Sequence, residues 1–113
     1  MIFMNTATKI KFSEHAIRDR GNRIATIATT IGFGNIVQTF HRVNHHGPCI
    51  HQITDSGVVI IKTPDEKEVI TCYAITLEKL KGYYEQIESR PPTALIKTVM
   101  SNQKKRKFLF ENS

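Results

Sequence analysis

A short stretch near the amino end, "KFSEHAIRDRG" (residues 11–21), combines side chains that suit chemistry on phosphate esters. On a helix, His15 and Arg18 lie three positions apart and share a face, and Asp19 lies four positions from His15, where its carboxylate can hold the imidazole ring. An imidazole exchanges protons near neutral pH, and a guanidinium group matches two phosphate oxygens at once. The stretch is therefore either a site for a phosphate-bearing ligand or a solvated helix with an inconsequential His–Asp pair.

Cleavage of an RNA phosphodiester sets specific requirements for such a site. One group must take the 2′-hydroxyl proton, another must protonate the leaving oxygen, and fixed cations must meet the charge that builds on the phosphate. The imidazole of His15 beside Arg18 fits this description, whereas Arg20 points elsewhere on a regular helix.

Several segments together resemble a known family. The strand "KIKF" runs into "SEHAIRDRG" and an apolar helix, and a strand "VITCYAI" follows at residues 69–75. This arrangement resembles the small HA…RG domains of mobile elements and toxin-like genes, which are grouped with the barnase–EndoU–colicin–RelE ribonuclease superfamily. The chain keeps His15-Ala16 and Arg20-Gly21, although the interval between the two pairs is shorter than in that family.

The resemblance implies roles for particular residues. It implies that His15 transfers protons, that Arg18 or Arg20 binds the phosphate, and that Thr71 or Tyr73 of the last strand donates a hydrogen bond. Thr71 and Tyr73 are two positions apart and so lie on the same face of a strand. For Tyr73 the alternative is a core aromatic residue whose hydroxyl group reaches the rim.

A second group of residues, "HRVNHHGPCIH" (residues 41–51), is rich in potential metal ligands. The spacing is not that of a zinc finger and no Cys-x-x-Cys pair accompanies it, so a hairpin with exposed histidines is the better interpretation. We expect neither a metal nor a cofactor. Cys49 and His51 are expected to share a strand face. Either Arg42 or His41 is expected to face the helix that carries His15, and Arg42 is a candidate nucleic-acid-binding residue. The potential metal ligands are His41, His45, His46, Cys49 and His51.

The elements that must position these residues follow from apolar spacing and turn residues. Residues 14–20 and a segment from Asn22 are expected as two short helices separated by Gly21, the second with Ile24, Ile27, Ala28 and Ile31 on its buried face. Four strands at 36–43, 49–54, 58–63 and 68–75 are joined by short links and should form an antiparallel meander. A helix through Leu77, Leu80, Tyr84 and Ile87 ends at Arg90-Pro91-Pro92, and residues 93–100 form a last short helix. The predicted class is α+β: two short N-terminal helices, a four-stranded antiparallel meander, a C-terminal helix and a basic tail.

Charge points to a polyanionic partner. The 113 residues carry a formal net charge of +6, and three of these charges belong to residues 103–113, where Lys104, Lys105, Arg106 and Lys107 stand against Glu111. The chain is therefore expected to consist of one domain over residues 1–102 and a flexible basic tail over 103–113 that contacts phosphates.

These observations define three function hypotheses. The first is a small cytoplasmic protein that binds nucleic acid, RNA rather than DNA, and cleaves RNA without a metal ion. The second is a non-catalytic phage or mobile-element inhibitor that binds a nucleic acid or a nucleic-acid-handling protein. The third is a structural or assembly module whose meander pairs with another copy. Two cysteines are too few for a disulfide framework, no long apolar run predicts a membrane partner, and the free edges of the meander leave homodimerisation open.

Overall fold

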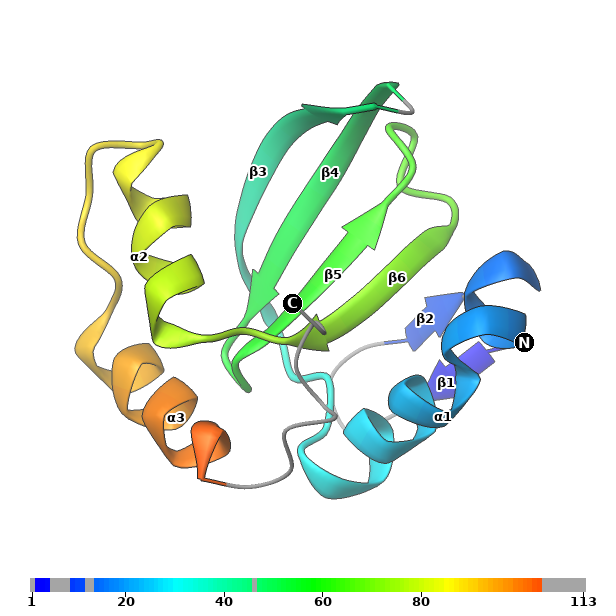
Figure 1. Ribbon diagram of the computed structural model, residues 1–113, viewed down its shortest axis with the longest axis horizontal. Coiled ribbons are helices and arrows are strands. Elements are labelled where there is room, and N and C mark those ends of the chain that lie inside the picture. The colour runs from blue at the N-terminus through cyan, green and yellow to red at the C-terminus, as the bar shows by residue number, and fades with distance from the viewer. Residues whose placement is uncertain (1, 5–8, 12–13, 46, 105–113) are drawn as a thin grey trace.

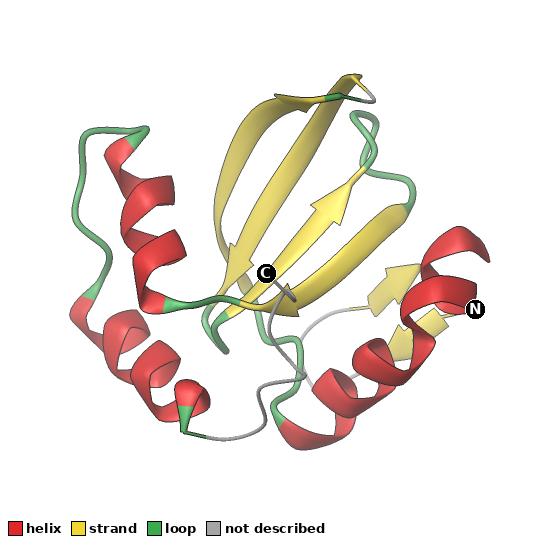
Figure 2. Cartoon of the chain, in the orientation of Figure 1, coloured by secondary structure: helices red, strands yellow, loops and turns green. Residues whose placement is uncertain are grey.

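The chain has the α+β composition that its sequence predicts. The computed structural model describes residues 2–4, 9–11, 14–45 and 47–104, and for residues 2–4, 9–11, 14–17, 19, 20 and 22 it describes the backbone alone. In Figures 1 and 2, α2 and α3 lie on one side of the central sheet and α1 lies on the other. In chain order the elements are β1 (Ile2–Met4), β2 (Lys9–Lys11), α1 (Glu14–Thr30), β3 (Ile36–Asn44), β4 (Gly47–Thr54), β5 (Val58–Lys62), β6 (Val69–Ala74), α2 (Leu77–Glu85) and α3 (Thr93–Gln103).

The central sheet is the antiparallel meander expected from the short links. Its strands are hydrogen-bonded in the order β3-β4-β5-β6, so β3 and β6 form its two edges. Gly57 closes the turn between β4 and β5 with a φ of +79°, and a Cβ atom there would stand 2.8 Å from Nδ2 of Asn102 in α3. Both the backbone conformation and the closeness of α3 therefore require glycine at this turn.

The amino-terminal half differs from the prediction of two short helices. α1 runs as one helix from Glu14 to Thr30, and Gly21 lies inside it rather than at a helix end. Gly21 has no positive φ, and a Cβ atom there would meet nothing within 4 Å, so the helix continues through it. Gly32, with a φ of +80°, follows the end of α1 instead. The strand expected in "KIKF" is present as β2, paired antiparallel with β1.

One face of the sheet packs against α1, and we call it the α1 face. The spacing that predicted a buried helix face is confirmed, because Ile24 and Ile27 are fully buried and Ala28 and Ile31 pack against them. The strands contribute alternate residues to this core, as expected for period-2 side chains. The buried residues from the strands are Val58, Ile60, Val69, Cys72 and Ala74.

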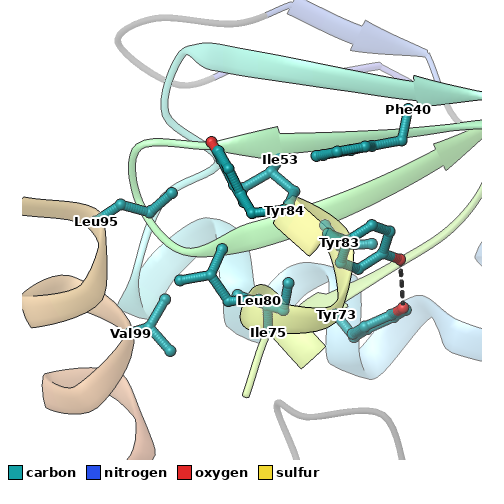
Figure 3. Close-up of a cluster of buried hydrophobic side chains, with 10 residues drawn as sticks. Phe40, Ile53, Tyr73, Ile75, Leu80, Tyr83, Tyr84, Leu95 and Val99 are labelled. Atoms are coloured by element: carbon teal, nitrogen blue, oxygen red, sulfur yellow. Dashed lines mark hydrogen bonds between the residues drawn. The ribbon is translucent and has the colours of Figure 1, made fainter. Parts of the chain in front are cut away.

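The opposite face packs against α2 and α3, and we call it the α2 face. Leu80, Tyr83 and Tyr84 of α2 and Leu95 and Val99 of α3 cover it. Figure 3 shows these side chains meeting the sheet residues Phe40, Ile53 and Tyr73.

The helix α2 begins where its sequence predicts and ends earlier. The side chain of Thr76 accepts a hydrogen bond from the backbone N–H of Lys79 and so caps the first turn. The helix ends at Glu85 rather than near Arg90, since Glu88 adopts a φ of +53° and the Ser89 N–H bonds to the Tyr84 carbonyl. Ile87, expected on the buried face, is therefore exposed.

Candidate functional site

The strongest link between the predicted site elements is a contact between α1 and the edge strand β6. A terminal guanidinium nitrogen of Arg23 donates a hydrogen bond of 3.0 Å to Oγ1 of Thr71. Because Cys72 packs on the α1 face, alternation places Thr71 on the opposite face, and Arg23 crosses the free edge of β6 to reach it. The helix that carries the predicted cations thus borders the strand that carries one of the predicted hydroxyl groups. We call this surface the α1–β6 edge.

The predicted site residues of α1 lie on this same helix. Arg18 is exposed, roughly one and a half turns before Arg23. The backbone of His15 lies about 12 Å before that of Arg23 along the helix axis, at the rise of an α-helix. The side chains of His15 and Arg20 lie outside the described residues, so the approach of His15 to a strand hydroxyl group stays a prediction.

Tyr73 lies with α2 rather than at the α1–β6 edge. Its side chain is 5% exposed, and its hydroxyl oxygen lies 3.3 Å from that of Tyr83, as Figure 3 shows. The ammonium group of Lys79 lies 5.2 Å from the centre of its ring. Of the two hydroxyl-bearing residues predicted for the site, the described contacts bring Thr71 to α1 and bring Tyr73 to α2.

Arg42 also faces α2, so it is not the residue that faces α1, and of the two alternatives His41 remains. Its guanidinium carbon stands 3.9 Å from the centre of the Tyr83 ring, and its Nε donates a 3.0 Å hydrogen bond to Oε1 of Gln86. The reason is alternation from Phe40, which is buried on the α2 face two positions earlier. His41, the other candidate, alternates to the α1 face and is exposed.

A chain of polar contacts joins the α2 face to the strand hairpin. Sγ of Cys49 lies 3.3 Å from Nε2 of His51, and Nδ1 of the same ring lies 2.6 Å from the hydroxyl oxygen of Tyr83. The Tyr83 hydroxyl group continues the chain to Tyr73. The prediction that Cys49 and His51 share a strand face is confirmed. We call Cys49, His51, Tyr83 and Tyr73 the thiol relay.

The histidine-rich hairpin holds no evident metal site in its described part. Among the residues whose side chains the structure describes, no three His, Cys, Asp or Glu side chains are grouped as metal ligands would be. His46 lies outside the described residues.

The second cysteine has a different environment from the first. Cys72 is fully buried on the α1 face, as its alternation with Thr71 and Tyr73 predicted. Burial raises the pKa of the Cys72 thiol to about 12, although the nearby Arg23 guanidinium acts in the opposite direction. This thiol is therefore protonated and unreactive at neutral pH.

The predicted basic tail begins at the end of α3. Lys104 is exposed and follows the last residue of that helix, whereas Lys105, Arg106 and Lys107 lie outside the described residues. Gln103, predicted to belong to the tail, accepts a 2.9 Å hydrogen bond from the Leu77 N–H at the start of α2. The folded part thus includes α3 to its last residue.

Sequence reasoning missed two residues: Tyr83, a member of the thiol relay, and Lys79, whose ammonium group lies over the Tyr73 ring. Tyr83 was not singled out, because its partner His51 is 32 positions away and nothing local marks the pairing. The one available signal was that Tyr83 follows Leu80 at helical spacing, which places it on the buried face of α2. Lys79 carries no signal for its position over Tyr73.

Comparison with known proteins gives no relative for the chain. Scans against family models, curated proteins and solved structures found no match. In the part of the chain that the structure describes, no helix is both long enough and apolar enough to cross a bilayer.

Proposed function

We propose that this protein binds single-stranded RNA along the α1–β6 edge and that the basic tail extends the contact. The hydrogen bond between Arg23 and Thr71 is the observation that carries the proposal. It joins α1, the helix that bears His15, Arg18 and Arg20, to the last strand, and it brings the Arg23 guanidinium group and the Thr71 hydroxyl group together at one border of the sheet. Single-stranded RNA binds surfaces of this kind through its phosphates.

The chemistry of Thr71 supports this use of the edge. Its Oγ1 accepts the Arg23 N–H, so its own O–H proton remains available to donate to a phosphate oxygen. In this proposal Arg18, Arg20 and the tail residues Lys104, Lys105, Arg106 and Lys107 bind phosphates. His15 transfers protons in a metal-independent cleavage, with Thr71 in place of Tyr73 as the hydrogen-bond donor to the reacting phosphate.

We also propose that the chain is related to the HA…RG domains of the ribonuclease superfamily. The packing of one helix on a face of a four-stranded antiparallel meander supports this relation only in overall architecture. The cytoplasm is the proposed compartment, which agrees with two free thiols. A homodimer would form through the edge strand β3, where Val37 and Val43 are exposed.

Binding is tested by fluorescence anisotropy with a labelled single-stranded RNA of mixed sequence. Arg18→Gln should weaken binding several-fold, since it removes one phosphate contact. Arg90→Gln is the matched control, because Arg90 is also exposed but lies in the connection between α2 and α3. Equal affinities of the two variants would remove the α1–β6 edge from the RNA-binding surface.

Cleavage is tested separately, by RNA turnover in the presence of a chelator. The wild type should cleave, His15→Ala should lose cleavage while keeping its affinity for RNA, and Thr71→Val should slow it. Binding without cleavage in the wild type would reject the enzyme and leave a non-catalytic binder. Binding to a nucleic-acid-handling protein without affinity for RNA would favour the phage or mobile-element inhibitor.

A further inference from the structure

The thiol relay is a second cluster of reactive side chains that the proposed RNA-binding surface does not use. Cys49 and His51 come from β4, Tyr83 from α2 and Tyr73 from β6. These residues lie on the α2 face, where the buried Phe40 ring packs against both Tyr83 and Tyr84. The cluster is thus held by strands and a helix rather than by a loop.

The order of the groups is that of a nucleophile, a base and a residue that orients the base. Sγ of Cys49 lies within hydrogen-bond distance of one ring nitrogen of His51, and the Tyr83 hydroxyl group holds the other at 2.6 Å. Activated cysteines in enzymes use this sequence of contacts. Because a tyrosine hydroxyl group both donates and accepts, it can serve His51 whether Nδ1 carries a proton or not. The imidazole can therefore take the thiol proton at Nε2 and keep its second hydrogen bond.

Polar and positively charged groups surround the relay. Nδ2 of Asn44 lies 3.7 Å from Sγ of Cys49 and donates to it. The guanidinium group of Arg42 lies over the Tyr83 ring, and Arg42 is the residue directly opposite Cys49 in the β3–β4 ladder. The Lys79 ammonium group lies over the Tyr73 ring. The charged groups that contact the relay from β3 and α2 in these interactions are both cations. Reactive cysteines in proteins occur in electropositive surroundings of this kind.

We propose that Cys49 is a thiol activated by His51 that reacts with hydroperoxides. The small size of the reagent follows from burial, since Cys49 is only 3% exposed and a larger electrophile would not reach its sulfur atom. In the reaction the thiol proton moves to Nε2 of His51, and the thiolate attacks one peroxide oxygen. The S–O bond forms as the O–O bond breaks, so the sulfur atom is oxidised by two electrons to a sulfenic acid. The leaving hydroxide or alkoxide takes the proton from His51 and departs as water or an alcohol.

The protein contains its own reference thiol for a test of this reaction. Cys72 is free like Cys49, but it has no base beside it in these contacts and its burial keeps it protonated. A small unhindered thiol, N-acetylcysteine amide, serves as the second reference, because it gives the reaction rate of a fully exposed thiol that has no activating base.

The experiment treats the full chain with hydrogen peroxide at pH 7, traps sulfenic acid with dimedone and locates the adduct by mass spectrometry. We expect the adduct at Cys49, formed faster than on N-acetylcysteine amide despite the burial of Cys49, and none at Cys72. His51→Gln should slow the reaction on the order of ten- to a hundredfold, the scale of a lost general base. Tyr83→Phe should give an intermediate rate, because it leaves the base in place without its orienting hydroxyl group.

Several results would overturn the proposal. A Cys49 that reacts more slowly than the free thiol, or an unchanged rate in His51→Gln, would show that the imidazole does not activate the sulfur atom. If His51→Gln does not fold, as judged by circular dichroism, the comparison of the wild type with the free thiol still decides. No nucleic acid is present in the assay, so its outcome is independent of the proposed RNA binding.

Discussion

The hydroxyl group of Tyr83 should make a measurable contribution to stability, because it joins α2 to two strands. Tyr83→Phe removes only this oxygen atom and keeps the ring beneath Arg42 and beside Phe40, 5.1 Å away between ring centres. The lost contacts are the 2.6 Å bond to His51 and the 3.3 Å bond to Tyr73. Removing one partner of a buried hydrogen bond costs about 1–3 kcal/mol, because the remaining group stays buried without a partner. We expect the free energy of unfolding to fall by that amount.

Urea unfolding followed by circular dichroism measures the change. A lower midpoint with an unchanged dependence on urea concentration would show that stability, rather than the unfolded state, has altered. Tyr84→Phe is the matched control, since Tyr84 is the neighbouring buried tyrosine and its hydroxyl group has no hydrogen-bond partner among the described residues. It should cost less than about 0.5 kcal/mol. Equal losses in the two variants would refute the reasoning that the relay hydrogen bonds stabilise the packing of α2.

Three further predictions concern other parts of the molecule. Burial raises the pKa of Cys72, so above about pH 9 the thiol ionises in the unfolded chain but not in the folded protein. The stability of the wild type relative to Cys72→Ala, measured by urea unfolding, should therefore fall by about 1.4 kcal/mol between pH 8 and pH 10. A stability difference that stays constant over this range would contradict the prediction. Asn102→Ala should cost about 1–3 kcal/mol in the same assay, since Nδ2 of this buried residue donates a 2.9 Å bond to the Ser56 carbonyl; a loss below 0.5 kcal/mol, roughly that of a surface change, would contradict it. Deleting residues 105–113 removes Lys105, Arg106 and Lys107 but spares the Gln103 contact. If all three cations bind RNA phosphates, the deletion should reduce the magnitude of the slope of log affinity against log salt concentration by about 2. An unchanged slope would exclude phosphate binding by these residues.

The sequence predicted those parts of the fold that depend on local patterns. Turn residues between alternating segments marked the meander, and the spacing of Ile24 and Ile27 marked the buried face of α1. The predicted helix boundary was wrong where one residue is compatible with both a helix end and a helix interior. Gly21 suits a helix end, but the packing of the residues after it carries the helix through.

The site was predictable only as far as neighbours along the chain determine it. The shared face of Cys49 and His51 follows from strand alternation, and so does the burial of Cys72. The pairing of Tyr83 with His51 and of Arg23 with Thr71 joins residues that are 32 and 48 positions apart. Such contacts depend on how whole elements pack, which no local pattern encodes.

Photo-crosslinking gives the most direct test of RNA binding at the α1–β6 edge. A single-stranded RNA containing 4-thiouridine is irradiated with the full chain, and the crosslinked peptides are identified by mass spectrometry. The proposal predicts crosslinks within residues 14–23, close to Thr71 and in residues 104–113. Crosslinks confined to α2 and α3, or none at a concentration that saturates binding, would contradict it.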